Sequence, residues 1–425
     1  MRILFTINPG TATFNCMVPL AWALRTAGHE VRVASQPLFA DEITQAGLTA
    51  VEVGRDLGVS RLIAAGGETD EEREEVRRGL PWPYHVVEEP ANADWHGLQV
   101  AWHHTVQHAK FEVFAMTSSL VEFARHWQPD LVLWEPFTPV GAIAAKACGA
   151  AHARLLHGVD VFALAREHFL RLEARQAPED RGDPLADWLG GYARKYGGEF
   201  TEDMARGHFT IDQLPPGLQV EADDTHYVRT HYVPYGGTAV VPKWLHTAPE
   251  RPRVALTLGT TATEHFTGYA VSVRDILDAL SDLDIEVVGT ISQSEQEKLG
   301  RVPDNARLVP YVPLHALAPT CSAAIHHAGF GTLSTFTRYG VPQLTLPYHF
   351  DEPILGRRLT EQGAGLDIDS AAATGETVRD SVLQLLNEPT FGKEANRLRD
   401  EIHATPTPNE LVGRLEELTT KYRPR

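Results

Sequence analysis

The chain has 425 residues, of which 43% are hydrophobic and 22% charged, the balance of a soluble globular enzyme with two domains or one large one. Its formal net charge of −18 at pH 7 argues against nucleic acid and anionic membrane as partners, although one anionic small molecule can still bind in a local pocket. No apolar run reaches the roughly 18 residues that a membrane span needs.

The first residues, "MRILFTINPG", are typical of a strand and a turn rather than of a signal peptide. The three cysteines, Cys16, Cys148 and Cys321, are scattered and lack the spacing of metal ligands. Reduced thiols of this kind are typical of the cytoplasm, so the sequence predicts a cytoplasmic location.

The N-terminal part of the chain predicts a strand, a turn, a helix ended by Gly28 and a second strand, at residues 1–7, 8–15, 17–28 and 30–35. These four segments in about 35 residues make one βαβ unit, which predicts a parallel sheet. A long helical stretch at about 96–126 then leads into the strand "DLVLW".

A passage rich in glycine and proline, "YVPYGGTAVVPKWLHTAPERP", separates this part from a second series of strands and helices. The fold class is therefore predicted to be α/β, with two doubly wound, Rossmann-like domains that face each other across a cleft. The predicted boundaries are 1–234 for the first domain, 235–252 for the linker, 253–404 for the second domain and 405–425 for a C-terminal amphipathic helix.

The stretch "AAIHHAGFGTLSTFTRYGVPQLTLP" predicts a strand at 322–327, a glycine turn and a helix at about 332–339. Free N–H groups and the helix dipole at such a turn favour an anion. Gly329 and Gly331 would let phosphate oxygens approach the backbone closely, and Thr332 adds a hydroxyl donor. The pattern alone leaves open both an anion site and a purely structural turn.

Two other interpretations of the histidines and glycines are weaker. His326 and His327 are adjacent on a strand and point to opposite faces, so they cannot chelate one ion together. The turn lacks the third glycine of a dinucleotide fingerprint. His104 and His108 lie one helical turn apart, but no convincing third ligand follows, except Glu112. No metal site is therefore predicted.

The segment "HHAGFGTLSTFTRYGVPQLTLPYHFDEP" resembles the nucleotide-sugar signature "HHGGxGTxxxAxxxGVPQLxLPxxxDQP" of GT-B glycosyltransferases. More narrowly, the chain is similar to bacterial enzymes, related to glycosyltransferase family 1, that attach deoxysugars to macrolides, anthracyclines and other natural products. The likeness runs almost from end to end and includes "VPLAWALRTAGHEVRVASQP", "YVPYGGTAVVPKWL" and "YVPLHALAPTCSAAIHHAG".

This resemblance implies a donor-binding set that holds the diphosphate, the base and the sugar of a nucleotide sugar. The residues implied for the diphosphate are His327, Gly329, Gly331, Thr332, Gly259 and Thr260. Those implied for the base are Tyr311 and Val312, and those for the sugar hydroxyls are Asp351 and Glu352. Two positions depart from the signature. Ala328 replaces a glycine, at little cost if its φ is negative, and Glu352 replaces a glutamine and would suit a cationic amino sugar.

The resemblance also implies a function: inverting transfer of a deoxysugar from a dTDP-sugar, or a UDP-sugar, to a hydrophobic aglycone. The acceptor would bind in the first domain and the donor in the second, without a metal or other cofactor, and the last helix would brace the first domain. Several relatives need an auxiliary, cytochrome-P450-like protein, and a homodimer is also compatible with the sequence. The alternatives are a catalytically silent homologue that binds ligand or activates a partner, and another GT-B enzyme such as an epimerase.

The general base is the main open question, because Thr13 occupies the position of the family's catalytic histidine and a hydroxyl is no base near neutral pH. Glu135 follows the strand "DLVLW" and is the best substitute, with His157 at the end of another strand as a second candidate; a structural role is open for both. Four aromatic residues are expected in the core or in the wall of the acceptor pocket, namely Trp95, Trp102, Phe111 and Phe114.

Overall fold

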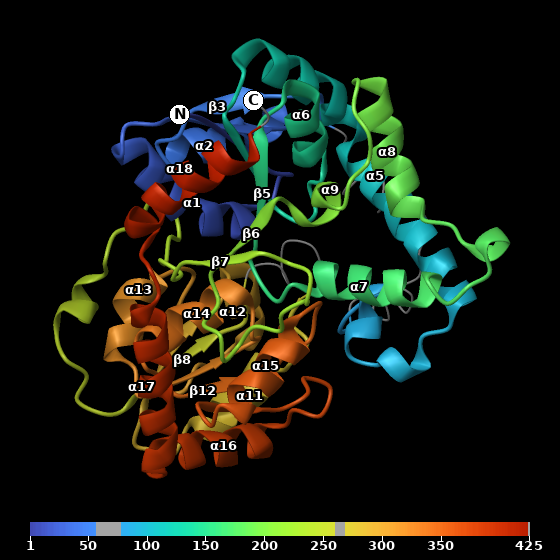
Figure 1. Ribbon diagram of the computed structural model, residues 1–425. Coiled ribbons are helices and arrows are strands. Elements are labelled where there is room, and N and C mark those ends of the chain that lie inside the picture. The colour runs from blue at the N-terminus through green and yellow to red at the C-terminus, as the bar shows by residue number, and fades with distance from the viewer. Residues whose placement is uncertain (57–77, 260–267, 424–425) are drawn as a thin grey trace.

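The structure, a computed structural model, describes residues 1–56, 78–259 and 268–423. Figure 1 shows two α/β halves, with the N-terminal half above and the C-terminal half below. The chain ends in the upper half, because its last helices run from the lower half back to the upper one. No described helix combines the length and the apolar character that crossing a bilayer would require.

The first half is built on a parallel sheet with the strand order β3-β2-β1-β4-β5-β6-β7. The strands are β1 (Arg2–Thr6), β2 (Glu30–Ser35), β3 (Ala50–Glu52), β4 (Leu131–Trp134), β5 (Ala151–Leu155), β6 (Phe209–Asp212) and β7 (Tyr227–Arg229). The helices are α1 (Thr11–Thr26), α2 (Ala40–Gln45), α5 (Trp95–Trp127), α6 (Val140–Cys148), α7 (Val161–Glu173), α8 (Pro184–Lys195) and α9 (Asp203–Arg206). Central strands such as "LVLW" are buried along their whole length, as parallel strands covered on both faces must be.

The second half repeats this plan with the strand order β10-β9-β8-β11-β12-β13. The strands are β8 (Arg253–Thr257), β9 (Glu286–Thr290), β10 (Ala306–Val309), β11 (Ala323–His326), β12 (Gln343–Thr345) and β13 (Gly365–Asp367). The helices are α11 (Val273–Leu280), α12 (Gln293–Leu299), α13 (Leu314–Leu317), α14 (Phe330–Arg338), α15 (Glu352–Glu361), α16 (Gly375–Asn387) and α17 (Pro389–Ala404). The predicted fold class, two doubly wound α/β domains, is confirmed.

In each sheet the strand order reverses once, between β1 and β4 in the first half and between β8 and β11 in the second. Ligands of doubly wound sheets bind beyond the carboxyl ends of the strands at such a reversal. The topology therefore places two candidate ligand regions, one in each half, before any side chain is considered.

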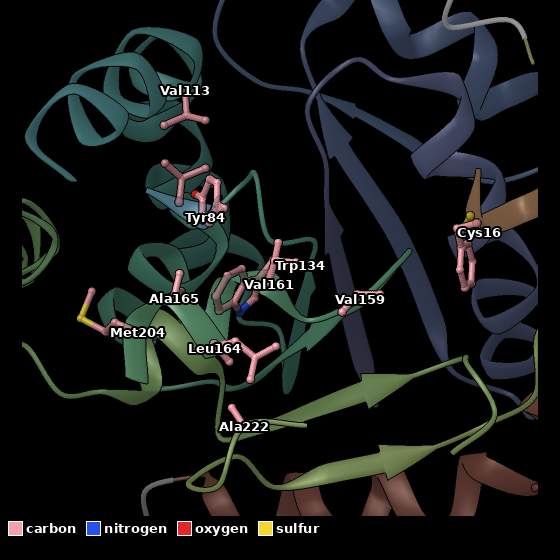
Figure 2. Packing of buried hydrophobic residues seen from close by; sticks show 14 of the residues in the cluster. Cys16, Tyr84, Val113, Trp134, Val159, Val161, Leu164, Ala165, Met204 and Ala222 are labelled. Carbon is pink, nitrogen blue, oxygen red and sulfur yellow. The ribbon is translucent and has the colours of Figure 1, made fainter. Parts of the chain in front are cut away.

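The two halves share buried apolar contacts. One cluster contains Trp134 and Val161 of the first half together with Ile354 and Leu355 of the second. Figure 2 shows part of this cluster, in which Trp134, Val161 and Leu164 lie close together below Tyr84. Removing such side chains from water is the main favourable term in folding, so the contact between the halves is stabilised in the same way as their interiors.

The last helix, α18 (Pro408–Tyr422), packs on the first half although it follows the second in the chain. Leu411 and Leu415 lie in the same buried cluster as Phe5 of β1 and Phe14 of α1. A capping box formed by Thr407 and Glu410 defines the start of this helix.

One predicted boundary is wrong in a way that matters for function. Helix α1 begins at Thr11 rather than near residue 17, because Gly10 has an extended backbone and accepts the first helical hydrogen bond from Phe14. Pro19, a residue type common in first helical turns, lies inside the helix instead. Thr13 is thus in the first turn of a helix and not in a loop.

Candidate active site

The imidazole of His327 lies directly after β11, between two glycines. A Cβ atom at Gly259 would lie 2.6 Å from its Cε1 atom, and one at Gly329 would lie 2.2 Å from its Nε2 atom. Any larger residue at either position would displace the ring. Burial lowers the pKa of His327 to about 4, so the ring is neutral at pH 7 and carries one N–H donor. Its Nδ1 atom has no hydrogen-bond partner among the described residues.

Helix α14 begins beside this ring, with Gly329 as its N-cap. No side chain caps the helix and its first turn holds no acidic residue, so the free N–H groups at its start are available to an anion. Gly331 and Thr332 lie in that first turn and are half-buried. The start of α14 and the His327 ring together therefore present hydrogen-bond donors that would suit an anionic group, and this place is called the seat.

Ala328 and His326 both lie just before Gly329, and the structure explains the conformation of the first and the contacts of the second. Ala328 has φ +68, so the condition under which it would cost little, a negative φ, is not met. The backbone keeps the left-handed conformation that favours glycine, and a Cβ there costs on the order of 1–2 kcal/mol. His326 faces away from the seat: its Nδ1 accepts from Ala328 N–H at 3.0 Å, and its Nε2 bonds to Gln343 Oε1 at 2.7 Å.

Asp351 and Glu352 lie at the start of α15, after the neighbouring strand β12. Glu352 Oε2 accepts from the backbone N–H groups of Tyr348 and His349 at 3.0 and 2.8 Å. Its Oε1 is 3.6 Å from His327 Nε2, so the carboxylate borders the anion seat. Burial, with the nearby charge of Glu352, raises the pKa of Asp351 to about 7.

The two residues implied for the base, Tyr311 and Val312, are both described. Tyr311 is 49% exposed, and its hydroxyl donates to the carbonyl of Gly236 in the linker at 2.7 Å. The side chain of Val312 is buried, which leaves its backbone as the group that a base could contact. Thr260, which the resemblance implies for the diphosphate, lies outside the described residues.

In the first half, Glu135 follows β4 directly and is almost fully buried. Its Oε2 accepts from Phe137 N–H at 2.7 Å, and its Oε1 accepts from the Thr138 hydroxyl. Burial nevertheless outweighs these bonds and raises the pKa of Glu135 to about 7. The carboxyl group therefore caps its own turn and is also poised to exchange a proton near neutral pH.

The two other candidates of the first half lie at neighbouring strand ends. Thr13 is half-buried in the first turn of α1, which follows β1, the strand paired with β4. His157 follows β5, and burial lowers its pKa to about 4. Its ring is 5.8 Å from the ring of Phe137. The end of the sheet thus gathers all three residues, although no direct bond links them.

An aromatic group that the sequence did not indicate covers this region. The Phe137 ring lies 5.0 Å from Phe162 of α7 and 5.5 Å from Phe350, which arrives from the other half of the molecule. Tyr84 joins them at 5.1 Å from Phe162. Phe350 also has φ +52, a strained conformation that turns the chain just before Asp351. An apolar, aromatic surface therefore lies next to Glu135 and His157.

The four aromatic residues singled out from the sequence do not form one cluster. Trp95 and Trp102 pack on Phe169. Their ring centroids lie 5.2 and 5.7 Å from the centroid of the Phe169 ring, so both residues belong to the core. Phe111 and Phe114 are 41% and 43% exposed on α5.

One group of described residues has the spacing of metal ligands, namely His152, Asp203 and His208. The hydrogen bonds do not suit a metal, however. Trp134 Nε1–H donates to His152 Nδ1 at 3.3 Å, and the backbone N–H of His152 donates to His208 Nδ1 at 3.1 Å. Both Nε2 atoms then carry hydrogen and point at Asp203, so the group is a polar network inside the fold.

Two family models match most of the chain, and known proteins match it over its full length. The model described as "Erythromycin biosynthesis protein CIII-like, N-terminal domain" matches residues 22–259, and the corresponding C-terminal model matches 274–418. The chain is 45% identical to the 10-deoxymethynolide desosaminyltransferase of Streptomyces venezuelae, over 100% of this chain and 98% of that protein. It is 40% identical to the aclacinomycin-T 2-deoxy-L-fucose transferase of Streptomyces galilaeus, over 100% and 97%.

A solved structure, glycosyltransferase VinC in complex with dTDP, superposes with a TM-score of 0.87 and 39% sequence identity. The superposition covers 99% of this chain and 100% of that one, so both halves and their connection are shared.

Proposed function

The chain belongs to the erythromycin biosynthesis protein CIII-like family and is a glycosyltransferase of GT-B architecture, and from that premise we propose which reaction it performs. The proposed reaction is inverting transfer of a deoxysugar from a dTDP-sugar to a hydrophobic natural-product aglycone. A UDP-sugar is the alternative donor. The donor binds at the strand ends of the second half and the aglycone at those of the first.

The observation that carries this proposal is the seat formed by His327, its two flanking glycines and the start of α14. A diphosphate leaving group gains negative charge as its bond to the anomeric carbon breaks. The helix dipole and fixed N–H donors stabilise that charge without a metal ion, and a neutral His327 adds one more donor. The similarity to VinC, a structure that contains dTDP, supports the assignment of the seat to a nucleoside diphosphate.

The acceptor is activated in the first half. We assign Glu135 as the general base: its carboxylate takes the proton of the acceptor hydroxyl while the acceptor oxygen bonds to the anomeric carbon and the diphosphate leaves from the opposite face. A pKa raised to about 7 is the value that a base needs near neutral pH. The rings of Phe137, Phe162 and Phe350 supply the apolar surface that a hydrophobic aglycone requires.

The sugar itself contacts Asp351 and Glu352 in this proposal. Two neighbouring carboxylates beside a neutral imidazole favour a sugar that carries a positive charge, because a cationic amino group offsets the electrostatic cost of their proximity. An amino-deoxysugar is therefore the donor sugar that we favour.

The test is turnover of dTDP- and UDP-deoxysugars with candidate aglycones, with and without a cytochrome-P450-like auxiliary protein. Activity is expected to persist in EDTA, since fixed protein donors stabilise the leaving group in place of an ion. Loss of activity in EDTA that manganese or magnesium restores would contradict this. If no donor is turned over under any condition while dTDP still binds, the proposed reaction is wrong and the alternative, a silent homologue that acts as a binding or activator protein, takes its place.

A further inference from the structure

The loop after β5 touches the start of α15 at one point between the two halves. Val159 N–H donates to Asp351 Oδ2 at 2.7 Å. The residue before it, Gly158, is buried, and a Cβ there would lie 2.2 Å from the same oxygen. The glycine is needed because the Asp351 carboxylate lies against its backbone. In the view of Figure 2, Val159 lies between Trp134 and Cys16.

The side chain of Gln219 makes hydrogen bonds to this loop, at Gly158 and Asp160. Its Oε1 accepts from Asp160 N–H at 3.1 Å, and its Nε2 donates to the carbonyl of Gly158 at 3.3 Å. The backbone carbonyl of Gln219 accepts from Arg358 of α15 at 3.2 Å. One buried side chain and its carbonyl therefore connect the loop that contacts Asp351 with the helix that follows Asp351.

A buried ion pair holds the far end of the same loop. Arg154 makes two hydrogen bonds to the carboxylate of Asp160, at 2.9 and 2.6 Å, and Asp160 Oδ1 also caps α7 through Ala163 N–H at 3.0 Å. Because bidentate pairs of this kind fix both position and orientation, the loop cannot shift without breaking several buried bonds.

We propose that Gly158, Val159 and Gln219 form a positioning element that sets the place of the Asp351 carboxylate for the donor sugar. This rests on the proposed function, in which Asp351 contacts the sugar. The element belongs to the half that binds the acceptor, so a contact between the two halves sets the position of Asp351. Binding of the sugar, but not of the diphosphate, therefore depends on this positioning element.

The deciding variant is Gly158→Ala, because its new Cβ cannot coexist with the Asp351 carboxylate at 2.2 Å. The matched control is Gly191→Ala on α8, where a new Cβ meets no atom within 4 Å. The measurements are the Kd of dTDP by calorimetry, and KM and kcat for the dTDP-sugar that the unchanged protein turns over. We expect KM of the dTDP-sugar to rise about tenfold or more in Gly158→Ala, the range for one lost bond to a charged group, while the Kd of dTDP stays within about twofold.

A second variant keeps the test decisive if Gly158→Ala does not fold. Gln219→Met removes the bonds of this side chain to Gly158, Asp160 and Asp212 without placing a second charge beside Asp212, so the same split is expected with a change of about threefold to tenfold. Equal loss of dTDP and dTDP-sugar affinity in both variants would mean that the loop is merely structural, and unchanged KM values would mean that the contact has no role. Either result overturns the inference. Absence of dTDP binding and of turnover in the unchanged protein would instead overturn the proposed function, and this inference with it.

Discussion

The turns after β11 and after β4 lie at equivalent places in the two sheets, each beside the reversal of strand order, but they are built differently. After β11, two glycines hold the His327 ring, and the N–H groups of a helix are left open. After β4, the Glu135 carboxyl group is closed in by its own turn, and rings from distant segments cover the region. The turn after β11 therefore depends on backbone conformation, whereas the turn after β4 depends on contacts between side chains.

Burial acts on both turns in the same direction, toward loss of charge. It lowers the pKa of the His327 base to about 4 and raises the pKa of the Glu135 acid to about 7. A neutral donor suits a leaving diphosphate, whose charge should be met by fixed dipoles. A carboxyl group that titrates near pH 7 suits proton transfer. The difference between the turns therefore fits the two proposed roles, in which the turn after β11 stabilises the leaving group and the turn after β4 activates the acceptor.

The largest expected effect is on the β4 side. Glu135→Gln should lower kcat at least about a hundredfold, since a general base contributes roughly 10²- to 10⁴-fold, and Thr13→Ala should change kcat by less than about tenfold. Steady-state kinetics with saturating donor measure both. In the unchanged enzyme kcat/KM should change with pH near 7, where both Glu135 and Asp351 ionise, and Gln at position 135 should remove the rise that ionisation of Glu135 contributes.

The control for this prediction is Glu122→Gln, at an exposed position of α5, which should leave kcat unchanged. Normal turnover by the Glu135→Gln enzyme would remove Glu135 from the mechanism and leave it as a cap for Phe137 and Thr138. His157 would then be the next candidate to replace.

On the β11 side, His327→Ala should weaken dTDP binding by roughly 5- to 150-fold, the effect of losing a hydrogen bond worth on the order of 1–3 kcal/mol. Because the ring is neutral well above its lowered pKa, the ratio of the two affinities should stay constant from about pH 6 to about pH 8. Calorimetry measures both quantities. His104→Ala, at an exposed position of α5, is the control, and undiminished dTDP affinity in the His327 variant would remove the ring from the seat.

A smaller effect is expected on the selection of the sugar, which the proposed function places between the turns after β4 and β11. Glu352→Gln keeps an oxygen for the backbone N–H groups of Tyr348 and His349 but removes one negative charge. The ratio of kcat/KM for an amino-sugar donor to that for a neutral one should fall about tenfold, the difference between a charge-assisted and a neutral hydrogen bond. Glu361→Gln, at the far end of the same helix, should leave the ratio unchanged. An unaltered ratio in the Glu352 variant would mean that this carboxylate does not contribute to the selection of an amino sugar over a neutral one.

The contrast between the turns also explains what could be predicted from the sequence. Strands such as β2 and β4, and the turn before α14, are local patterns of apolar residues and glycines, so the sequence predicts their bounds to within a few residues. Phe137, Phe162 and Phe350 come from three segments that approach one another only in the folded chain, and no local period indicates them. The contact of Val159 with Asp351 joins residues 192 positions apart and was missed for the same reason.

The smallest expected effect concerns the strain in the glycine turn, at Ala328. Its left-handed φ of +68 costs on the order of 1–2 kcal/mol, which Ala328→Gly would relieve. The same change removes a fully buried methyl group, worth about 0.8 kcal/mol, and loosens the unfolded chain by about 0.4–1 kcal/mol. The two sides nearly cancel, so the free energy of unfolding should change by less than about 1 kcal/mol.

Ala324→Gly separates the strain from the other two terms. Ala324 is equally buried, lies in β11 and has no positive φ, so its replacement loses the methyl group and the chain stiffness but relieves no strain. It should therefore cost about 1–2 kcal/mol more than Ala328→Gly in urea unfolding, with dTDP affinity unchanged in the Ala328 variant. Equal costs for the two variants would mean that Ala328 stores no strain. The turn would then accept alanine as readily as glycine, and its backbone would owe its shape to the residues around it.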